Sequence, residues 1–331
     1  MRMSFFAQKW NKALSLARSP AEKRWLQVFG GLLLASSAYE LLRPLKDVRG
    51  KVVLITGGGA GLGRALAFQF AGIGARLVLW DLDGAALSAT AAELRERYPG
   101  SAPLTAVCDV SDPTAVYAEA TRTLAAAGPV FTVVGNAGTV SGRDLLSTPD
   151  HKIELTFAVN ALQHAWLAKA FLPAMLDARE GHFLVVSSVT AFVGAPKMID
   201  YSASKAASRA LALALRAELR AAGHGDRIGV TIVCPSHIET GLFKGFSTPL
   251  IPAMTPEYVA SCSVAAFQRG EVELVLPGLV RLGVVLRALL PQWASDAMDR
   301  LGGVHAGMQG HDGRASEKAF AIMEKMRGGG K

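Results

Sequence analysis

The stretch VVLITGGGAGLG, residues 52–63, decides the fold of this chain. Its first five residues form a short apolar run that predicts a buried strand, and the periodic segment that follows predicts a helix. Three of the glycines between them, Gly57, Gly61 and Gly63, let the backbone approach a pyrophosphate closely. A helix N-terminus adds free N–H groups and a favourable dipole. The stretch therefore predicts a turn that binds the phosphates of a dinucleotide.

The alternation of short apolar runs and longer amphipathic segments continues to residue 276. Strands are expected at Val52–Thr56, Arg76–Asp81, Leu104–Cys108, Val130–Val134, Phe183–Ser188, Gly229–Cys234 and Val272–Leu276. Helices are expected near residues 62–73, 85–98, 113–127, 152–178, 202–222 and 255–269. Near-continuous hydrophobic strands separated by helices indicate a parallel sheet covered on both faces. The sequence therefore predicts a single-domain α/β fold, a Rossmann-like doubly wound parallel sheet.

The composition excludes several classes of protein. The chain has 331 residues, 50% of them hydrophobic, so it can bury a sizeable core. Its net charge of +8 lies mainly in the first 51 residues, which carry +7, while residues 52–268 carry −1. A nucleic-acid binder carries its positive charge on the folded domain, so no nucleic-acid partner is expected. Cys108, Cys234 and Cys262 are unclustered and indicate neither a disulfide framework nor a metal site.

A carboxylate, Asp81, closes the second expected strand, eighteen residues after Gly63. At that position it would accept hydrogen bonds from the adenosine ribose hydroxyls and repel a 2′-phosphate. Ala60 occupies the place in the glycine turn where a basic residue would otherwise meet that phosphate. NAD(H) is therefore expected as the cofactor in preference to NADP(H). Asp109, at the end of the third strand, is expected to meet the adenine amino group, to cap a helix, or both.

A phenol and an ammonium lie four residues apart in the segment Tyr201-Ser202-Ala203-Ser204-Lys205. In a helix both groups lie on one face, one turn apart. A free tyrosine has a pKa near ~10, and a neighbouring cation favours the phenolate and lowers that value. On its own the spacing also describes a solvated helix pair. Together with the glycine turn, it predicts a proton donor and acceptor.

These motifs form an ordered set that resembles the short-chain dehydrogenase/reductase superfamily over residues 50–277. The set comprises the glycine turn, Asp109, Asn136-Ala137-Gly138, Asn160, Ser188, Tyr201 with Lys205, and Pro235 to Thr240. A finer resemblance links the chain to the membrane-bound branch of 17-beta-hydroxysteroid dehydrogenases of lipid droplets and related retinol dehydrogenases. The segments that carry it are Leu77–Asp81, Thr156–Asn160 and Lys169–Met175, together with hydrophobic segments at both ends of the chain.

The resemblance implies a role for each matching residue. Tyr201 exchanges a proton with the substrate oxygen, and Ser188 hydrogen-bonds the same oxygen. Lys205 lowers the Tyr201 pKa and holds the nicotinamide ribose, while Asn160 anchors the water through which Lys205 reaches solvent. The other matching positions contact the cofactor: Gly57, Gly61, Leu62, Gly63, Asp81, Asp109, Val110, Asn136, Ala137, Gly138, Pro235, Ile238 and Thr240. Active members are typically dimers or tetramers, so a homodimer is expected.

Three positions depart from the family pattern. Gly135 replaces the first Asn of the common N-N-A-G motif, which is expected to weaken support of the fourth strand without loss of activity. Ser236 stands where a glycine commonly follows Pro235, which could alter the turn beneath the nicotinamide. Ser187 lies beside Ser188 and could be the active serine, but the thirteen-residue distance to Tyr201 favours Ser188.

An apolar substrate site is expected around Tyr201. Residues 236–268 are expected to form a mobile flap over the substrate, because this segment follows the sixth strand. Its apolar side chains are Leu242, Phe243, Phe246, Leu250, Ile251 and Met254, and Phe192, Val193, Met198 and Ile199 lie just before Tyr201. Such a pocket favours a lipophilic alcohol or ketone; the alternative is that these side chains only pack the flap.

Both ends of the chain are expected to bind a membrane. Residues 1–48 are read as a basic and hydrophobic anchor, whose uncharged run Trp25–Tyr39 spans about 22 Å as a helix, short of the ~30 Å hydrocarbon core. A packed helix and a cleaved signal peptide are the alternatives. Residues 278–301 are read as an amphipathic membrane-associated helix, or as dimer packing or core, with one face formed by Leu279, Leu282, Leu286, Leu289, Leu290 and Trp293. Residues 302–331 are read as a solvated polar tail, in which His305 and His311 are too poorly spaced to predict a metal.

The sequence thus predicts an enzyme whose domain at residues 49–277 transfers a hydride between NAD(H) and a steroid, retinoid or other lipid. One alternative is a bacterial-type reductase of 3-oxoacyl or other small lipid ketones. Another is a membrane- or droplet-coating protein that senses NAD(H) without turnover. The expected location is a membrane surface with the catalytic domain in the cytoplasm, on the endoplasmic reticulum or lipid droplets in a eukaryote.

Overall fold

The computed structural model describes residues 45–243, 245–246, 251–303, 307–308 and 314–328, with isolated residues between 19 and 31. Residues Asp47–Lys331 form one compact unit. Most of the predicted anchor at residues 1–48 lies outside the described residues, as do Leu250, His305 and His311. The predictions made for those residues therefore stay predictions.

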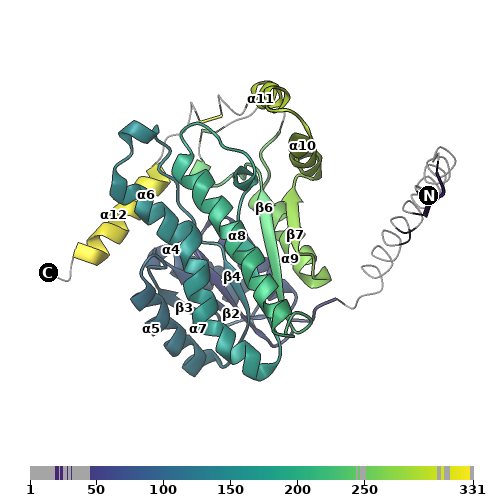
Figure 1. The fold of residues 1–331 in the computed structure, drawn as a ribbon. Helices are drawn as coiled ribbons and strands as arrows, with labels where there is room; N and C mark the ends of the chain where they lie inside the picture. The colour runs from purple at the N-terminus through teal and green to yellow at the C-terminus, as the bar shows by residue number, and fades with distance from the viewer. Residues whose placement is uncertain are drawn as a thin grey trace. The chain divides into compact units, whose positions relative to one another are not determined.

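The unit is built on seven parallel strands (Figure 1). They are β1 (Val52–Thr56), β2 (Arg76–Asp81), β3 (Leu104–Val107), β4 (Val130–Gly135), β5 (Gly181–Val186), β6 (Ile228–Pro235) and β7 (Glu273–Leu276). Their order in the sheet is β3-β2-β1-β4-β5-β6-β7, with every neighbouring pair parallel. The strand order reverses between β1 and β4, and ligands of such sheets bind outside the carboxyl ends at that point. The predicted doubly wound sheet is confirmed.

Helices cover both faces of this sheet. One face carries α3 (Gly61–Gly72), α4 (Gly84–Arg97) and α9 (Pro256–Arg269), and the other carries α5 (Pro113–Ala127), α7 (Gln163–Ala178) and α8 (Ile199–Ala221). Successive side chains of a strand point to opposite faces. In β2, Leu77 and Leu79 pack under the first set of helices, while Val78 and Trp80 pack under the second. Burial on both faces explains why the strand sequences are almost entirely apolar.

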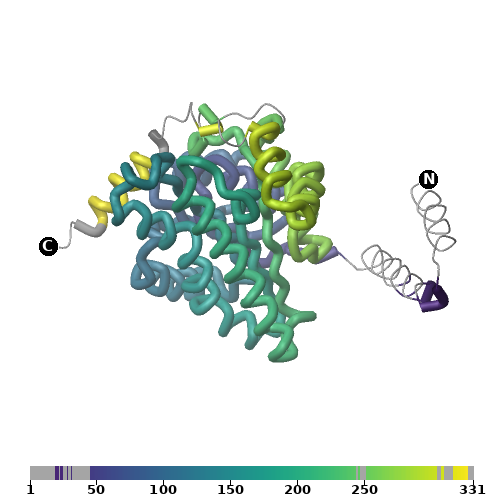
Figure 2. Tube along the Cα trace, turned by 45° about the horizontal axis from the view of Figure 1, so that its top comes forward, coloured from purple at the N-terminus to yellow at the C-terminus, as the bar shows by residue number. Residues whose placement is uncertain are grey.

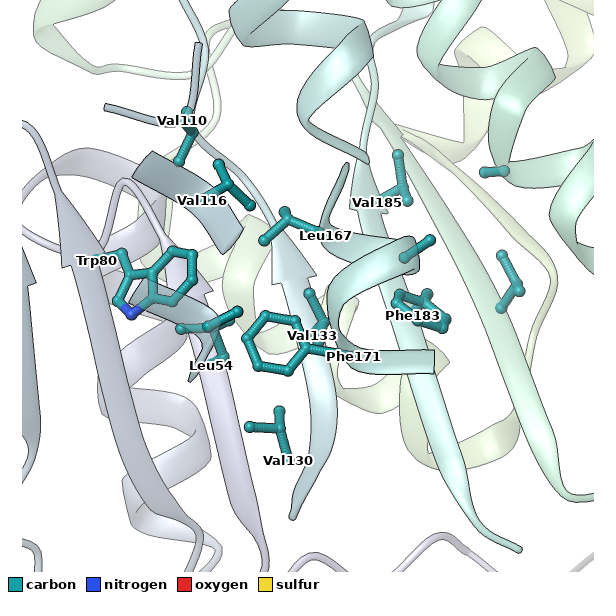
Figure 3. Close-up of a cluster of buried hydrophobic side chains, with 14 of the residues drawn as sticks. Leu54, Trp80, Val110, Val116, Val130, Val133, Leu167, Phe171, Phe183 and Val185 are labelled. Carbon is teal, nitrogen blue, oxygen red and sulfur yellow. The ribbon is translucent and has the colours of Figure 1, made fainter. Parts of the chain in front are cut away.

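The hydrophobic core between the sheet and helices α5, α7 and α8 holds the end of β2 in place (Figure 3). Trp80 and Phe171 are fully buried, with ring centroids 5.9 Å apart. The Trp80 indole N–H donates to the Thr123 hydroxyl at 3.2 Å, so its one polar atom is satisfied. These contacts hold β2 against α5 and α7 immediately before β2 ends at Asp81.

The predicted flap at residues 236–268 is wrong for its second half. Residues 256–268 belong to α9, which buries Val259, Val264 and Phe267 against α3. Phe70 of α3 and Phe267 meet edge to face, with ring centroids 5.4 Å apart. Among the described residues of the predicted flap, Ser236, Ile238, Thr240 and the short helix η4 (Gly241–Phe243) line the cleft.

The predicted single helix at residues 278–301 is two helices, α10 (Gly278–Leu289) and α11 (Gln292–Leu301). Pro291 separates them, because proline disfavours helical backbone in the residue before it and lacks an N–H donor. The Arg287 guanidinium pairs with the Asp299 carboxylate and joins the two helices. Among the residues that the structure describes, no helix has the length and apolar character to cross a membrane.

The predicted solvated tail is also wrong in its last part. Residues 314–328 form α12 (Arg314–Gly328), which lies beside α6 (Asp150–Phe157) in both views (Figures 1 and 2). Phe320 and Met323 of α12 are only 1% and 3% exposed. The composition of this tail predicted that it is solvated, because it is rich in glycine and charged residues. The few buried residues of α12 lie on one side and pack against the protein.

Candidate active site

The glycine turn after β1 depends on close backbone contacts. A Cβ on Gly63 would lie 1.9 Å from the Gly57 carbonyl oxygen, so no other residue fits there. Gly57 itself has a φ of 66°, in the left-handed region that favours glycine. Ala60 precedes α3 without a side-chain cap, and the first turn of α3 has no acidic residue. The N-terminus of α3 is therefore open to an anion such as a pyrophosphate.

Three side chains tie the glycine turn to the end of β4. The Asn136 amide donates to the Thr56 carbonyl oxygen at 2.9 Å. The Thr56 hydroxyl accepts from the backbone N–H groups of Asn136 at 3.0 Å and Ala137 at 3.1 Å, and donates to the Gln163 amide oxygen at 3.1 Å. The Gln163 amide nitrogen in turn donates to the Ala137 carbonyl oxygen at 2.7 Å. No sequence motif marks Gln163, because its partners come from β1 and from the loop after β4.

Asp81 lies in the cleft at the end of β2, as predicted. One carboxylate oxygen accepts from the Gly59 N–H at 2.9 Å, and the other accepts from the Asp83 N–H at 3.0 Å. These bonds hold the carboxylate beside the glycine turn. Both oxygens keep further lone pairs for ribose hydroxyls.

Asp109 also lines the cleft, just after β3. Its carboxylate accepts from the Ser111 N–H at 2.8 Å. The cap of α5 is a different residue, Asp112, which accepts from the Thr114 N–H at 2.9 Å. The expectation that Asp109 caps that helix is therefore wrong.

Helix α8 presents Tyr201 and Lys205 to the cleft, one turn apart. The Ser188 hydroxyl donates to the Pro235 carbonyl oxygen at 3.4 Å, and its side chain favours the ionised form of the Tyr201 phenol. The Lys205 ammonium lies 5.6 Å from the Tyr201 ring centroid and donates to the Val186 carbonyl oxygen at 2.8 Å. The Ser187 hydroxyl donates to the Lys205 carbonyl oxygen at 2.8 Å, so this serine supports the α8 backbone. Of the two serines, Ser188 is the one beside the phenol.

The Tyr201 pKa departs from the prediction. Burial raises this pKa well above its usual value, and the hydrogen bond from Ser188 offsets only part of the effect. The same burial lowers the pKa of Lys205 to about 8, because its charged form is also desolvated. Desolvation of the phenol therefore dominates, and Lys205 is not among the groups that shift the Tyr201 pKa, contrary to the prediction.

Asn160 lies in a π-helical turn, η2 (Ala158–Leu162), that interrupts the predicted helix at 152–178. Its amide oxygen accepts from the Thr139 N–H at 2.8 Å, and its amide nitrogen donates to the Thr139 carbonyl at 2.8 Å and the Ser204 hydroxyl at 2.9 Å. Turns of this kind are frequent at functional sites. Asn160 thus fixes the loop after β4 against α8. Its predicted contact with a water stays a prediction.

A cleft of about 340 Å³ brings most of the predicted site residues together. Those that line it are Gly57, Gly61, Leu62, Asp81, Asp109, Val110, Asn136, Ala137, Gly138, Tyr201, Lys205, Pro235, Ile238 and Thr240. Gly63, Asn160 and Ser188 are not among the lining residues, whereas Ser187, the neighbour of Ser188, is. Ser236 also lines the cleft, and its N–H donates to the Leu276 carbonyl oxygen at 2.8 Å. Sequence reasoning missed Ser316, Ala319 and Met323, which reach the cleft from α12.

The Tyr201 end of the cleft is apolar. Tyr201 packs in a buried cluster with Val140, Met198 and Met308. The Phe243 ring meets the Tyr201 ring edge to face, with centroids 5.2 Å apart. Of the residues predicted from the segment before Tyr201, Met198 belongs to this cluster, whereas Ile199 is 47% exposed.

Gly135 is explained by a histidine from α7. A Cβ on Gly135 would lie 2.3 Å from Nδ1 of His164, so the imidazole occupies the space next to this glycine. Burial, together with repulsion from Lys205, lowers the pKa of His164 to about 3, so the ring is neutral at physiological pH. Strand pairing continues through Gly135, which pairs with Val185. β4 therefore extends to Gly135, and the expected weakening of its support stays a prediction.

Restoring the common family residue at this position is expected to destabilise the protein. Gly135→Asn should lower the free energy of unfolding by about 3 kcal/mol, because the new side chain overlaps the His164 ring in a packed interior. Adding His164→Ala should recover at least half of that loss. Urea unfolding of the two single variants and the double variant measures the coupling. Strictly additive losses would show that the two positions do not share this space.

The fold and the arrangement of the cleft define a dinucleotide-binding oxidoreductase. A model of the short chain dehydrogenase family matches residues 51–249. The chain therefore belongs to the short-chain dehydrogenase/reductase family, whose members act on alcohol groups.

Known proteins place the chain in a branch of this family. It is 40% identical to epidermal retinol dehydrogenase 2 of Mus musculus, over 80% of this chain and 88% of that protein. It is 35% identical to 17-beta-hydroxysteroid dehydrogenase 13 of Homo sapiens, over 82% of this chain and 92% of that protein. These relatives bear out the finer resemblance to the hydroxysteroid and retinol dehydrogenase branch.

Solved structures share the fold. A short-chain dehydrogenase/reductase from Burkholderia phymatum in complex with NAD superposes with a TM-score of 0.67 and 28% identity, covering 74% of this chain and 95% of that chain. Similar structures of the family hold NADP or NADPH instead. The similarity therefore supports a nicotinamide dinucleotide as the cofactor. It does not distinguish NAD from NADP.

Proposed function

We propose that this chain transfers a hydride between NAD(H) and a lipophilic alcohol or ketone, with Tyr201 as general acid and base. The observation that carries the proposal is one cleft that contains the open glycine turn, Asp81, and the Tyr201 phenol beside Ser188. A protein that only sensed the dinucleotide would not require a buried phenol and ammonium at its apolar end.

The residues of the cleft fit a nicotinamide dinucleotide. The turn at Gly57 and the N-terminus of α3 suit the pyrophosphate, and the Asp81 carboxylate suits ribose hydroxyls. At the other end, Lys205 would hold the second ribose. The bound cofactor supplies the acceptor or donor of the hydride. The protein contributes position and proton transfer.

Tyr201 and Ser188 handle the charge that develops on the substrate oxygen. In reduction, Tyr201 donates its proton to that oxygen while the Ser188 hydroxyl donates a hydrogen bond to it. In oxidation, Tyr201 takes the proton back. Burial raises the Tyr201 pKa, so the phenol is protonated at neutral pH, as an ordinary tyrosine is, but it is a weaker acid than a solvated one.

The cofactor choice depends on Asp81. We expect kcat/KM with NADH to exceed that with NADPH by about 100-fold, because the carboxylate repels a 2′-phosphate. Asp81→Asn should reduce this preference at least tenfold, mainly by lowering the KM for NADPH. Steady-state kinetics with both cofactors measures it, with NADH as the internal reference for each variant. A wild-type preference for NADPH would contradict the assignment of NAD(H).

The substrate class follows from the apolar end of the cleft. Leu242 and Phe243 line this end of the cleft, and Val140, Met198 and Met308 pack with Tyr201 in a buried apolar cluster. Such walls suit a steroid, a retinoid or another lipid, and relatives carry the names retinol dehydrogenase and 17-beta-hydroxysteroid dehydrogenase. The direct test is NADH oxidation with a panel of hydrophobic ketones and short 3-oxoacyl compounds. No turnover with any of the ketones would reject the proposal, and faster turnover of the 3-oxoacyl compounds would reject the lipid class.

We further propose that α10 and α11 lie on a membrane surface. Their apolar side chains Leu279, Leu289 and Trp293 are 76%, 77% and 75% exposed, an unusual density of large apolar residues for solvent. A surface-lying helix buries one apolar face in the headgroup region, and a second anchor makes such binding stable. The basic residues before Lys51 would supply the second contact. Homodimerisation stays a prediction that light scattering can check.

Vesicle flotation tests the membrane proposal. Replacing Leu279, Leu289 and Trp293 together by serine should lower the amount of protein that floats with anionic vesicles at least threefold, because the apolar face is lost. Combining this change with deletion of residues 1–45 should abolish recovery. Leu146→Ser, at a fully exposed leucine elsewhere, serves as the control. Unchanged recovery of the combined variant would contradict both anchors.

A further inference from the structure

Helix α12 closes one side of the same cleft. Three of its side chains, Ser316, Ala319 and Met323, line the cleft together with Asp81 and Val110. Asp81 ends β2 and Val110 follows β3, so both lie at the end of the cleft remote from Tyr201. On the proposed function, this end holds the adenosine half of the dinucleotide.

Specific ion pairs hold α12 in this position. The Glu317 carboxylate accepts from the Lys152 ammonium at 2.7 Å and from the Arg143 guanidinium at 2.9 Å. The Lys318 ammonium donates to Asp83 at 2.7 Å, two residues beyond Asp81. Lys152 is only 8% exposed, and its ammonium lies 5.0 Å from the centroid of the buried Phe320 ring. A partly desolvated, multivalent contact of this kind fixes a helix more firmly than isolated surface pairs.

Ser316 carries a polar atom that the protein leaves unsatisfied. The residue is 2% exposed, and its hydroxyl has no hydrogen-bond partner among the described residues. Buried hydroxyls are normally paired, and an unpaired one at the wall of a cleft indicates a ligand that pairs with it. The hydroxyl can both donate and accept, as the ring nitrogens and hydroxyls of an adenosine require.

Met323 supplies an apolar surface opposite the loop after β3. Its thioether lies 3.7 Å from the Ser111 hydroxyl and is 3% exposed. Val110 and Leu82 line the same part of the cleft with hydrocarbon. A flat base between such walls is shielded from water on both faces, and a flexible thioether adapts to an aromatic ring.

We propose that α12 is the outer wall of the adenosine subsite, in which Met323 packs on the adenine and Ser316 hydrogen-bonds the adenosine moiety. This inference rests on the proposed dinucleotide site. Because the ligand contacts α12 and the body of the domain together, its binding and the docking of α12 stabilise each other. The coupling is reciprocal: variants that loosen the docking of α12 lower the affinity for the ligand, and the bound ligand reduces the local unfolding of α12.

Calorimetric titration with ADP-ribose tests this wall apart from turnover, because ADP-ribose lacks the nicotinamide. Met323→Ala removes the packing surface, and Glu317→Gln removes the ion pairs without touching the ligand. Each should raise the dissociation constant for ADP-ribose at least tenfold, and Ser316→Ala should raise it at least threefold. Lys325→Gln, at an exposed position of the same helix, should stay within twofold of wild type.

Hydrogen exchange of the unmodified protein gives a second readout that needs no variant. Saturating ADP-ribose should slow exchange of the amides of residues 316–326 at least fivefold. Equal affinity of Met323→Ala, Glu317→Gln and wild type for ADP-ribose would overturn the proposal while leaving the dinucleotide site intact. Unchanged exchange in α12 on saturation would overturn it in the same way. Failure of wild type to bind ADP-ribose would overturn both this wall and the proposed cofactor site.

Discussion

Replacing Tyr201 by phenylalanine is expected to lower kcat at least ~1,000-fold, within the range that positioned acid–base groups contribute. The substitution removes only the phenol oxygen, which is the group beside Ser188. The ring contact with Phe243 does not depend on that oxygen, so the local packing should persist. The dissociation constant for NADH should therefore stay within about threefold of wild type. Initial rates with a hydrophobic ketone and fluorescence titration with NADH provide the two measurements.

A tyrosine outside the cleft is the matched control for this variant. Tyr117 lies on α5 and is 37% exposed, so Tyr117→Phe should leave kcat and NADH binding unchanged. If Tyr201→Phe kept more than a tenth of wild-type kcat, the proton would have to come from another group. If it lost NADH binding as well, the phenol would be a binding group rather than the acid.

Replacing Lys205 by methionine is expected to abolish most activity and to stabilise the fold. Activity should fall at least ~100-fold, because the ammonium is a charged donor at the reacting end of the cleft. Burial lowers the Lys205 pKa from 10.5 to about 8, a shift that costs on the order of 3 kcal/mol at neutral pH. Loss of the hydrogen bond to the Val186 carbonyl oxygen offsets about 1 kcal/mol of the gain. A net gain of about 2 kcal/mol in the free energy of unfolding is therefore expected below pH 7.

The stability gained by Lys205→Met depends on pH in a defined direction. A lysine whose folded pKa is lowered destabilises the protein fully below that pKa, and the penalty is relieved as the pH rises from 8 to 10.5. The advantage of Lys205→Met should therefore shrink between pH 6.5 and pH 9.5. Urea unfolding at both pH values measures it, with Lys169→Met, at an exposed site on α7, as a neutral control. A variant less stable than wild type at pH 6.5 would refute the desolvation argument.

The fold could be read from the sequence because its signals are local. The strands begin and end within about two residues of their predicted bounds, since each is a short apolar run flanked by turn residues. The glycine turn and the Tyr201–Lys205 spacing are likewise contiguous patterns, and the structure brings both to one cleft. Three interpretations were wrong: the helix predicted near residues 255–269 packs in the core and is not part of a flap, Pro291 divides 278–301, and residues 314–328 pack on the domain.

The rest of the site depends on contacts between distant segments, which no local pattern encodes. Gln163 supports the glycine turn from α7, and His164 fills the space beside Gly135. Glu317 reaches Lys152 across 165 residues of sequence. The Tyr201 pKa also depends on burial, which the spacing to Lys205 cannot reveal. In α12, the spacing of Ser316, Phe320 and Met323 on one helical face was the available signal, but the charged composition concealed it.

Deuterium transfer tests the central claim most directly. NADH carrying deuterium at both C4 positions is incubated with the full chain and a hydrophobic ketone, and the alcohol is analysed by mass spectrometry. The proposed chemistry predicts one deuterium on the carbon that bears the new hydroxyl, and no such product from Tyr201→Phe. An alcohol formed without deuterium at that carbon, or no alcohol from any hydrophobic ketone, would contradict it.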